Sequence, residues 1–114
     1  MPFFEIEHQP EKQIFDGVKI RTVYGEKIMM SFVHFAPHSV VPSHSHPHEQ
    51  MGMVLEGTFE LVISGEGRQL EKGDTYLIPS GIVHSARSFD QPAIALDIFS
   101  PPREEYKLPM REAY

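Results

Sequence analysis

Four side chains that could share one metal ion give the clearest chemical signal in this sequence. His44, His46 and His48 lie within five residues, Gln50 follows them, and His84 comes much later behind a Pro-Ser-Gly segment. Imidazole nitrogens and an amide oxygen suit a divalent transition metal better than Ca²⁺ or Mg²⁺, which prefer shells of oxygen atoms. We therefore predict that His44, His46, Gln50 and His84 bind one divalent ion per chain. The same ligands suit Ni, Zn, Mn, Fe or Co.

The spacing of these residues supports convergence on one point. His44 and His46 alternate, so on an extended chain they face the same side, and Gln50 has the same parity. The alternative is that the histidine-rich segment is a solvated surface or an incidental metal chelator. His48 is compatible with contact to a ligand or substrate and equally with a solvated loop position. The histidines without a partner pattern are interpreted as structural or surface residues: His8, His34 and His38.

Composition narrows the class of protein. A chain of 114 residues is long enough for one core, so we expect a single domain over residues 1–114. A net charge of −6 argues against nucleic-acid binding but permits a small anionic ligand. The chain has no cysteine, which excludes disulfides and thiolate metal sites and suits a cytoplasmic protein. Neither a signal peptide nor a membrane span is expected.

Short alternating apolar runs separated by Gly, Pro or Ser predict an all-β fold. Many short strands at close spacing favour a sandwich or barrel, in which closure removes exposed strand edges. Only residues 103–107 suggest a helical turn. The predicted strands are Val18–Tyr24, Ile28–Phe35, Gln50–Glu56, Thr58–Ile63, Arg68–Glu71, Thr75–Pro79, Val83–Ser88 and Ile94–Phe99.

Two of these strands, Ile28–Phe35 and Gln50–Glu56, are apolar on both faces. A barrel strand whose outer face meets water should carry polar residues there. A second sheet, the N-terminal segment or another subunit must therefore cover these outer faces. We predict a homodimer.

Two charged residues near the C-terminus are candidates for chemistry. Asp97 interrupts an apolar strand, where it is either a solvent-facing residue on an edge strand or a carboxylate inside a barrel cavity, with a raised pKa suited to proton transfer. Arg103 follows two prolines that stiffen the chain before it. It is either a surface arginine paired with Glu104 or Glu105, or a clamp for a carboxylate at the barrel mouth.

The histidine segment and the later Pro-x-Gly-x-x-His segment resemble the two motifs of the cupin superfamily. The first motif has a leading glycine, two alternating histidines, a glutamate and a closing glycine. The sequence matches it with His44, His46 and Gly57, but places Gln50 at the glutamate and His38 at the leading glycine. The second motif is matched by Gly73, Pro79, Gly81 and His84, with Ser88 where asparagine is usual. The core motifs span residues 42–88, and the resemblance implies a conical antiparallel β-barrel, commonly dimeric.

The segments 44–50 and 97–106 are similar to one branch in particular, the KdgF-type pectin degradation proteins. Members convert 4,5-unsaturated monouronates, released by pectate and alginate lyases, into linear keto-deoxyuronates without a redox step. The resemblance implies metal ligation by His44, His46, Gln50 and His84. It further implies proton transfer by Asp97, packing against the sugar by Phe99, and a salt link from Arg103 to the uronate carboxylate.

Two other classes of function are compatible with the same residues. One is a different metal-dependent cupin enzyme, such as a dioxygenase or a lyase acting on a small acid. The other is a non-catalytic cupin that binds a sugar or small acid. The replacement of the motif glutamate by neutral Gln50 leaves the site more positive, which favours a divalent Lewis acid over O₂ activation.

Overall fold

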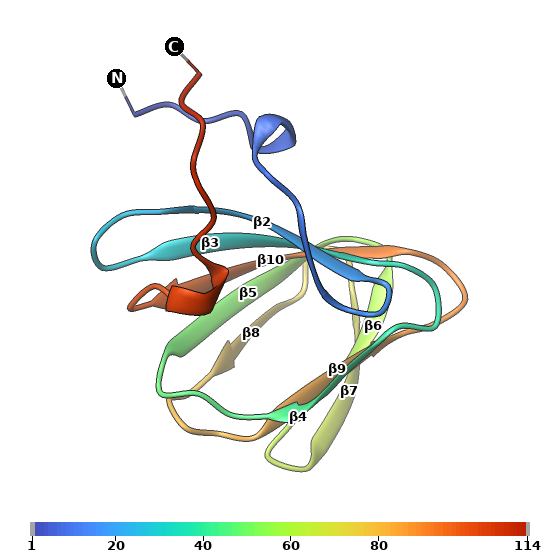
Figure 1. Ribbon diagram of the computed structural model, residues 1–114. Coiled ribbons are helices and arrows are strands. Elements are labelled where there is room, and N and C mark those ends of the chain that lie inside the picture. Colours follow the sequence, from blue (N-terminus) through green and yellow to red (C-terminus); the bar gives the residue numbers. More distant parts are fainter. Residues whose placement is uncertain (1, 114) are drawn as a thin grey trace.

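The computed structural model describes residues 2–113, which form two packed antiparallel β-sheets (Figure 1). The larger sheet has the strand order β1-β2-β3-β10-β5-β8 and the smaller has the order β4-β9-β6-β7. This arrangement, a jelly-roll barrel, confirms the predicted all-β antiparallel barrel. The elements are η1 Ile6–His8, β1 Lys12–Phe15, β2 Val18–Tyr24, β3 Met29–Phe35, β4 Val40–His44, β5 Glu49–Glu56, β6 Thr58–Ile63, β7 Glu66–Glu71, β8 Thr75–Ile78, β9 His84–Ser88, β10 Ala93–Ser100 and η2 Glu104–Tyr106.

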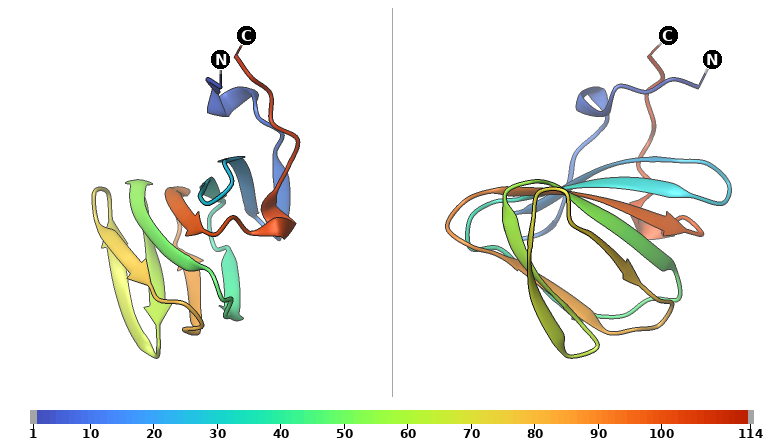
Figure 2. Two further views of the ribbon diagram at one scale, coloured as in Figure 1. Left: turned by 90° about the vertical axis from the view of Figure 1, so that its left-hand side faces the viewer. Right: turned by 180° about the vertical axis from the view of Figure 1, so that it is seen from behind.

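The interior between the two sheets has an apolar end and a polar end. At the apolar end, the rings of Phe35 on β3 and Phe59 on β6 stack with their centroids 5.1 Å apart. Phe35 is paired with Ala93 at the start of β10, whereas Phe99 near the end of β10 is paired with Gln50. The candidate site residues therefore gather at the opposite end of the interior from the aromatic stack. Figure 2 shows the two sheets from two further sides.

Strand alternation decides which side chains enter the interior. Along β5 the buried residues are Gln50, Gly52 and Val54, whereas Met51 and Met53 remain exposed on the other face. β3 alternates in the same way, with its odd-numbered residues buried. Gln50 thus lies on the inward face of β5, as its shared parity with His44 and His46 predicts.

Each of the eight predicted strands overlaps an observed one, but β1 and β4 were not predicted. Both lie at sheet edges. β4 contains Pro42, which cannot donate a ladder hydrogen bond and is tolerated at an edge. A proline inside a short run weakens the strand pattern of this segment, which carries His44. Two predicted strands are one residue too long, since β8 ends at Ile78 rather than Pro79 and β9 begins at His84 rather than Val83.

His38 keeps the backbone geometry of the glycine whose place it takes in the first motif. Its φ angle is 56°, in the left-handed region that favours glycine. The turn between β3 and β4 therefore retains its shape, and its main chain is held by a hydrogen bond of 2.7 Å from His38 N to Phe89 O.

The segment after β10 turns back across the larger sheet and carries η2 (Figure 1). Thr22 Oγ1 on β2 donates a hydrogen bond of 2.7 Å to Tyr106 O. Further along, Gln9 Nε2 donates to Arg111 O at 2.8 Å, and Arg111 N donates back to Gln9 Oε1 at 2.9 Å. These contacts fix the C-terminal segment, and with it Arg103, against the sheet.

The outer face of the larger sheet is only partly covered. Phe4 and Ile6 of the N-terminal segment lie beside Met30 and Phe32, so this segment, one of the three covers that the sequence allows, shields part of the face. Within residues 2–113 nothing comparable covers β5 and β8. The described part of the chain also has no helix with the length and apolar character needed to cross a membrane.

Candidate metal centre

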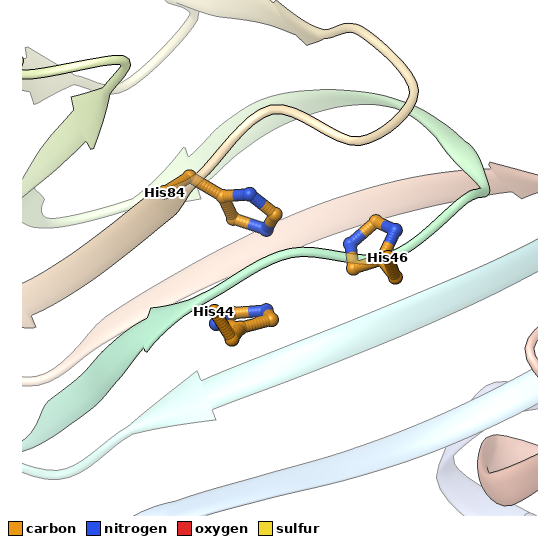
Figure 3. Close-up of side chains that lie close together, drawn as sticks. All are labelled: His44, His46 and His84. Atoms are coloured by element: carbon orange, nitrogen blue, oxygen red, sulfur yellow. The ribbon is translucent and has the colours of Figure 1, made fainter.

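Three imidazoles converge at the polar end of the interior (Figure 3). His44 ends β4, His84 begins β9, and the two are paired in register, while His46 lies in the connection to β5. One nitrogen from each ring lies within 4.8 Å of the others. Residues far apart in the sequence thus meet because β4 and β9 are neighbours in the smaller sheet. The predicted convergence of His84 on the histidine pair is present in the structure.

The same backbone interaction orients all three rings. Nδ1 of His44 lies 2.8 Å from Pro42 O, Nδ1 of His84 lies 2.8 Å from Ile82 O, and Nδ1 of His46 lies 3.1 Å from His48 O. A ring nitrogen that donates to a carbonyl leaves the lone pair on the other nitrogen. Each Nε2 can therefore act as a ligand, in the arrangement typical of metal-binding histidines.

Gln50, the fourth predicted ligand, places its side-chain oxygen beside one of the three imidazoles. Its Oε1 lies 3.2 Å from His46 Nε2. When His46 Nδ1 donates to the backbone, this contact brings two lone pairs face to face, an arrangement that a shared cation makes favourable. The donor set of three imidazoles and one amide oxygen fits a divalent transition metal.

The surroundings of His46 and His84 favour the uncharged form of these two imidazoles. Burial, reinforced by the Arg103 guanidinium and the neighbouring histidines, lowers the pKa of His46 to about 4. Burial also lowers the pKa of His84 below its usual value, although a backbone hydrogen bond to Ile82 opposes this. Neutral imidazole is the form that binds metal, so protons compete weakly for these two rings near neutral pH.

Asp97 lies in the middle of the larger sheet and lines the cavity beside the histidines. Its strand, β10, runs between β3 and β5, so the alternative of an edge-strand aspartate is wrong. Burial raises the pKa of Asp97 to about 6, against hydrogen bonds from Tyr76 and Gln50 and the charge of Arg103, which lower it. Tyr76 donates its hydroxyl proton to Asp97 Oδ1 at 2.6 Å. Asp97 can therefore both gain and lose a proton near neutral pH.

This raised pKa predicts that Asp97 destabilises the metal-free fold when it is ionised. The folded protein holds the proton up to pH about 6, whereas the unfolded chain loses it near the ordinary aspartate value of 3.8. Stability should therefore fall as pH rises between these values and then stay lower. Two pKa units correspond to about 3 kcal/mol. Asp97→Asn should raise the free energy of unfolding by up to this amount at pH 8.

Urea titrations of the metal-free wild type and of Asp97→Asn, at pH 4 and pH 8, check the prediction. The stability difference should be large at pH 8 and small at pH 4. Equal differences at the two pH values would show that Asp97 carries no such electrostatic strain. A bound cation stabilises the ionised form of Asp97. Added metal should therefore reduce the difference in free energy of unfolding between the wild type and Asp97→Asn at pH 8.

Arg103 lines the same cavity, with Phe99 and Tyr106 beside it. Its guanidinium carbon is 4.1 Å from the ring centroid of Tyr106 and 5.2 Å from that of Phe99. Its side chain is only 12% exposed, and Nε donates to Glu105 Oε1 at 2.7 Å. The structure thus combines the two interpretations made from the sequence: Arg103 pairs with Glu105 and also faces the cavity.

The remaining histidines take different places. His48 is half-buried beside His46, with ring centroids 5.3 Å apart, and its Nδ1 is buried with no partner in the described part of the chain. His8 is exposed and pairs with Glu5, while His34 lies on the outer face of β3. The structure places His48, but neither His8 nor His34, next to the candidate metal ligands.

Sequence reasoning missed three residues of this site. Tyr76, Tyr106 and Ser31 all line the cavity. The signal for Ser31 was present, because it is the one polar residue on the inward face of its predicted strand. Its hydroxyl is buried and has no hydrogen-bond partner among residues 2–113. A lone buried hydroxyl costs about 1–3 kcal/mol unless something satisfies it, so this atom is suited to a polar ligand.

Comparisons with known proteins agree with this geometry. The chain is 33% identical over 106 residues to the pectin degradation protein KdgF of Dickeya dadantii, covering 91% of this chain and 96% of that protein. Its fold matches KdgF from a Halomonas species with a TM-score of 0.87 and 28% identity, covering 94% of this chain and 99% of the other. An RmlC-like cupin from Shewanella frigidimarina matches with the same TM-score at 27% identity, covering 92% and 95%.

The family model for the cupin domain matches residues 31–99, which hold both histidine motifs and most of the two sheets. The three-histidine cluster lies within this stretch, where paired strands bring it together. The similarity to KdgF extends well beyond it, over 91% of the chain. The chain belongs to the cupin family and is a KdgF-like member of it.

Proposed function

We propose that this protein is a metal-dependent enzyme that converts 4,5-unsaturated monouronates, from pectin or alginate breakdown, into linear keto-deoxyuronates. The observation that carries the proposal is the content of one cavity. This cavity is lined by two of the proposed metal ligands, His44 and His84. It is also lined by Asp97, which can exchange a proton, and by the cationic Arg103. The similarity to proteins named for pectin degradation supports the substrate class.

The reaction is an isomerisation in which one proton changes place. The C1–O5 bond of the cyclic hemiacetal breaks, the C1 hydroxyl loses its proton, and C1 becomes an aldehyde. O5 is released as an enolate oxygen, which becomes the oxygen of the C5 ketone when C4 gains a proton. Electrons and atoms balance without an oxidant or water. The chain therefore needs one group that accepts and returns a proton, and Asp97 is suited to this.

The residues around Asp97 bind and orient the substrate. His44, His46, Gln50 and His84 would hold one divalent ion, which when bound supplies a Lewis acid for substrate oxygen atoms. The terminal nitrogens of Arg103 would pair with the uronate carboxylate, because a guanidinium binds carboxylates in a bidentate manner. Phe99 packs beside Arg103 and offers an apolar surface to the sugar ring. His48, which lies beside His46, would contact the substrate as well.

The experiment is to mix metal-loaded protein with lyase-generated unsaturated monouronate and follow loss of the absorbance of the conjugated double bond. NMR of the product should show the open-chain ketone. An unchanged substrate at saturating metal would refute the proposal. Oxygen uptake in place of isomerisation would indicate a dioxygenase, and tight binding without turnover would indicate a binding protein.

We also propose that two copies of the chain associate through the uncovered outer face of the larger sheet. Ile98, Met51 and Leu77 form one cross-strand row on β10, β5 and β8. Met51 is 54% exposed and Leu77 is 47% exposed. A contiguous apolar sheet face of this kind marks an interaction surface, and a second copy offers the same apolar row.

Met51→Glu should therefore convert a dimer into a monomer, because two carboxylates would be buried near the centre of a two-fold interface. Light scattering coupled to size exclusion gives the mass. Val83→Glu is the matched control, since Val83 is equally exposed, at 54%, but lies just before β9 in the smaller sheet. A monomeric wild type at micromolar concentration would contradict the proposal.

A further inference from the structure

A tyrosine crosses an entire strand to reach the carboxylate of Asp97. Tyr76 lies on β8, at the edge of the larger sheet, and Asp97 lies on β10, with β5 between them (Figure 1). Neighbouring strands are about 4.8 Å apart, so the two backbones are separated by roughly 10 Å. The hydroxyl of Tyr76 nevertheless lies 2.6 Å from Asp97 Oδ1.

Gly52 provides the space for this crossing. It is the residue of β5 that is in register with both Tyr76 and Asp97. A Cβ atom at Gly52 would lie 2.3 Å from Tyr76 Cζ and 2.4 Å from its hydroxyl oxygen. Real Cβ atoms do not approach other atoms this closely, so any other residue at position 52 would displace the ring.

The backbone does not explain a glycine at this position. Gly52 is absent from the glycines of the described chain that have positive φ angles, such as Gly57 and Gly81. Glycine also weakens a strand interior, because it has no side chain to pack and loses more conformational freedom on folding. The close approach of the Tyr76 ring is therefore the physical reason for Gly52.

We propose that Tyr76 is a positioning residue, which holds the Asp97 carboxylate in the orientation that the reaction needs. Gly52 leaves the space that the Tyr76 ring requires. This inference rests on the proposed function for its kinetic consequence. One carboxylate oxygen is held by the phenol, and the Gln50 side chain also hydrogen-bonds to the group. Phe59 packs edge-on against the Tyr76 ring, with centroids 6.3 Å apart and planes at 87°. Asp97 thereby keeps one orientation toward the cavity.

The same network accounts for the glutamine at the metal site. The Gln50 side chain contacts both His46, through Oε1, and Asp97. Only an amide can offer an oxygen to a cation and an N–H donor to a carboxylate at once. A glutamate at position 50 would place a second carboxylate against Asp97. Tyr76, Asp97 and Gln50 thus form one connected set that ends at the metal-binding residues.

The kinetic test is Tyr76→Phe, which removes only the hydroxyl. We expect kcat to fall about 10- to 100-fold, the effect of losing a hydrogen bond to a charged group, with KM and metal content unchanged. Tyr24→Phe is the matched control, because its hydroxyl also donates to a fixed acceptor, Leu108 O at 3.2 Å, outside the cavity. An unchanged kcat in Tyr76→Phe would overturn the proposal.

A second measurement does not depend on turnover. In protein with ¹³C-labelled tyrosine, the buried hydroxyl proton of Tyr76 should give a slowly exchanging downfield resonance that shifts in Asp97→Asn and is absent from Tyr76→Phe. If the wild type does not convert uronate, the proposed function fails, while this resonance still decides whether Tyr76 holds Asp97. A hydroxyl that exchanges rapidly and ignores Asp97→Asn would overturn the positioning role.

Gly52→Ala tests the space requirement independently. In the wild-type background it should lower Tm and reduce kcat at least as much as Tyr76→Phe. In a Tyr76→Val background, where no ring lies over position 52, it should cost little further stability. Equal losses of Tm in the two backgrounds would show that Gly52 does not serve the tyrosine.

Discussion

Asp97→Asn should lower kcat about 10²- to 10⁴-fold, the range expected for loss of a group that transfers a proton in the reaction. Asparagine keeps the size of the side chain and can still accept the Tyr76 hydroxyl, so the cavity and the metal-binding residues should remain intact. Metal content, measured by elemental analysis, should not change. Steady-state assays with unsaturated monouronate give the rate.

Asp90→Asn is the matched control, because Asp90 is an exposed residue of the loop before β10. A fully active Asp97→Asn protein would refute the role of Asp97. The combination of lower activity and higher stability is the more specific result. It would show that the protein tolerates an unfavourable buried carboxylate because the reaction needs it.

The sequence was sufficient to predict the parts of the site that follow strand parity or a motif. His44 and His46 alternate along an extended segment, and His84 follows a proline-glycine turn, so their convergence can be inferred from the order of the residues alone. The prediction that Gln50 lies on the inward face of β5 was correct for the same reason. These features depend on local geometry, which the sequence encodes directly.

Features that depend on pairing between distant strands were not predictable in the same way. Nothing local relates Tyr76 to Asp97, and their contact requires β8, β5 and β10 to be neighbours in a particular register. The position of Asp97 in the middle of a sheet also depends on strand order, since β10 lies between β3 and β5. The order of residues along the chain is therefore compatible with both interpretations of Asp97, and only the strand order separates them.

Part of the candidate site is formed by a segment with little regular structure. Arg103 and Tyr106 follow β10 in a region whose only element is the short turn η2. Their positions are set by backbone contacts to β2 and by Gln9, which lies near the other end of the chain. Such contacts leave no periodic pattern, so the sequence analysis assigned roles to Arg103 and Phe99 but none to Tyr106.

His84→Ala should abolish turnover at equimolar metal and weaken metal binding by more than about 100-fold. Loss of groups that merely orient a ligand typically costs 10- to 100-fold in affinity, and His84 is itself a candidate ligand. Its strand, β9, is also separate from the segment that carries His44 and His46, and His84 is the one histidine on that strand. Competition with a chromophoric chelator gives the affinity.

Thermal unfolding supplies a readout that needs no substrate. A ligand that binds only the folded state at 100 times its Kd stabilises the fold by about 2.7 kcal/mol. Added metal should therefore raise the Tm of the wild type and of His8→Ala, whose imidazole is exposed and distant from the cluster. The Tm of His84→Ala should not respond. A variant that still binds one equivalent with wild-type affinity would mean that the convergence of β4 and β9 does not create the metal site, and the Lewis-acid part of the proposed mechanism would fail with it.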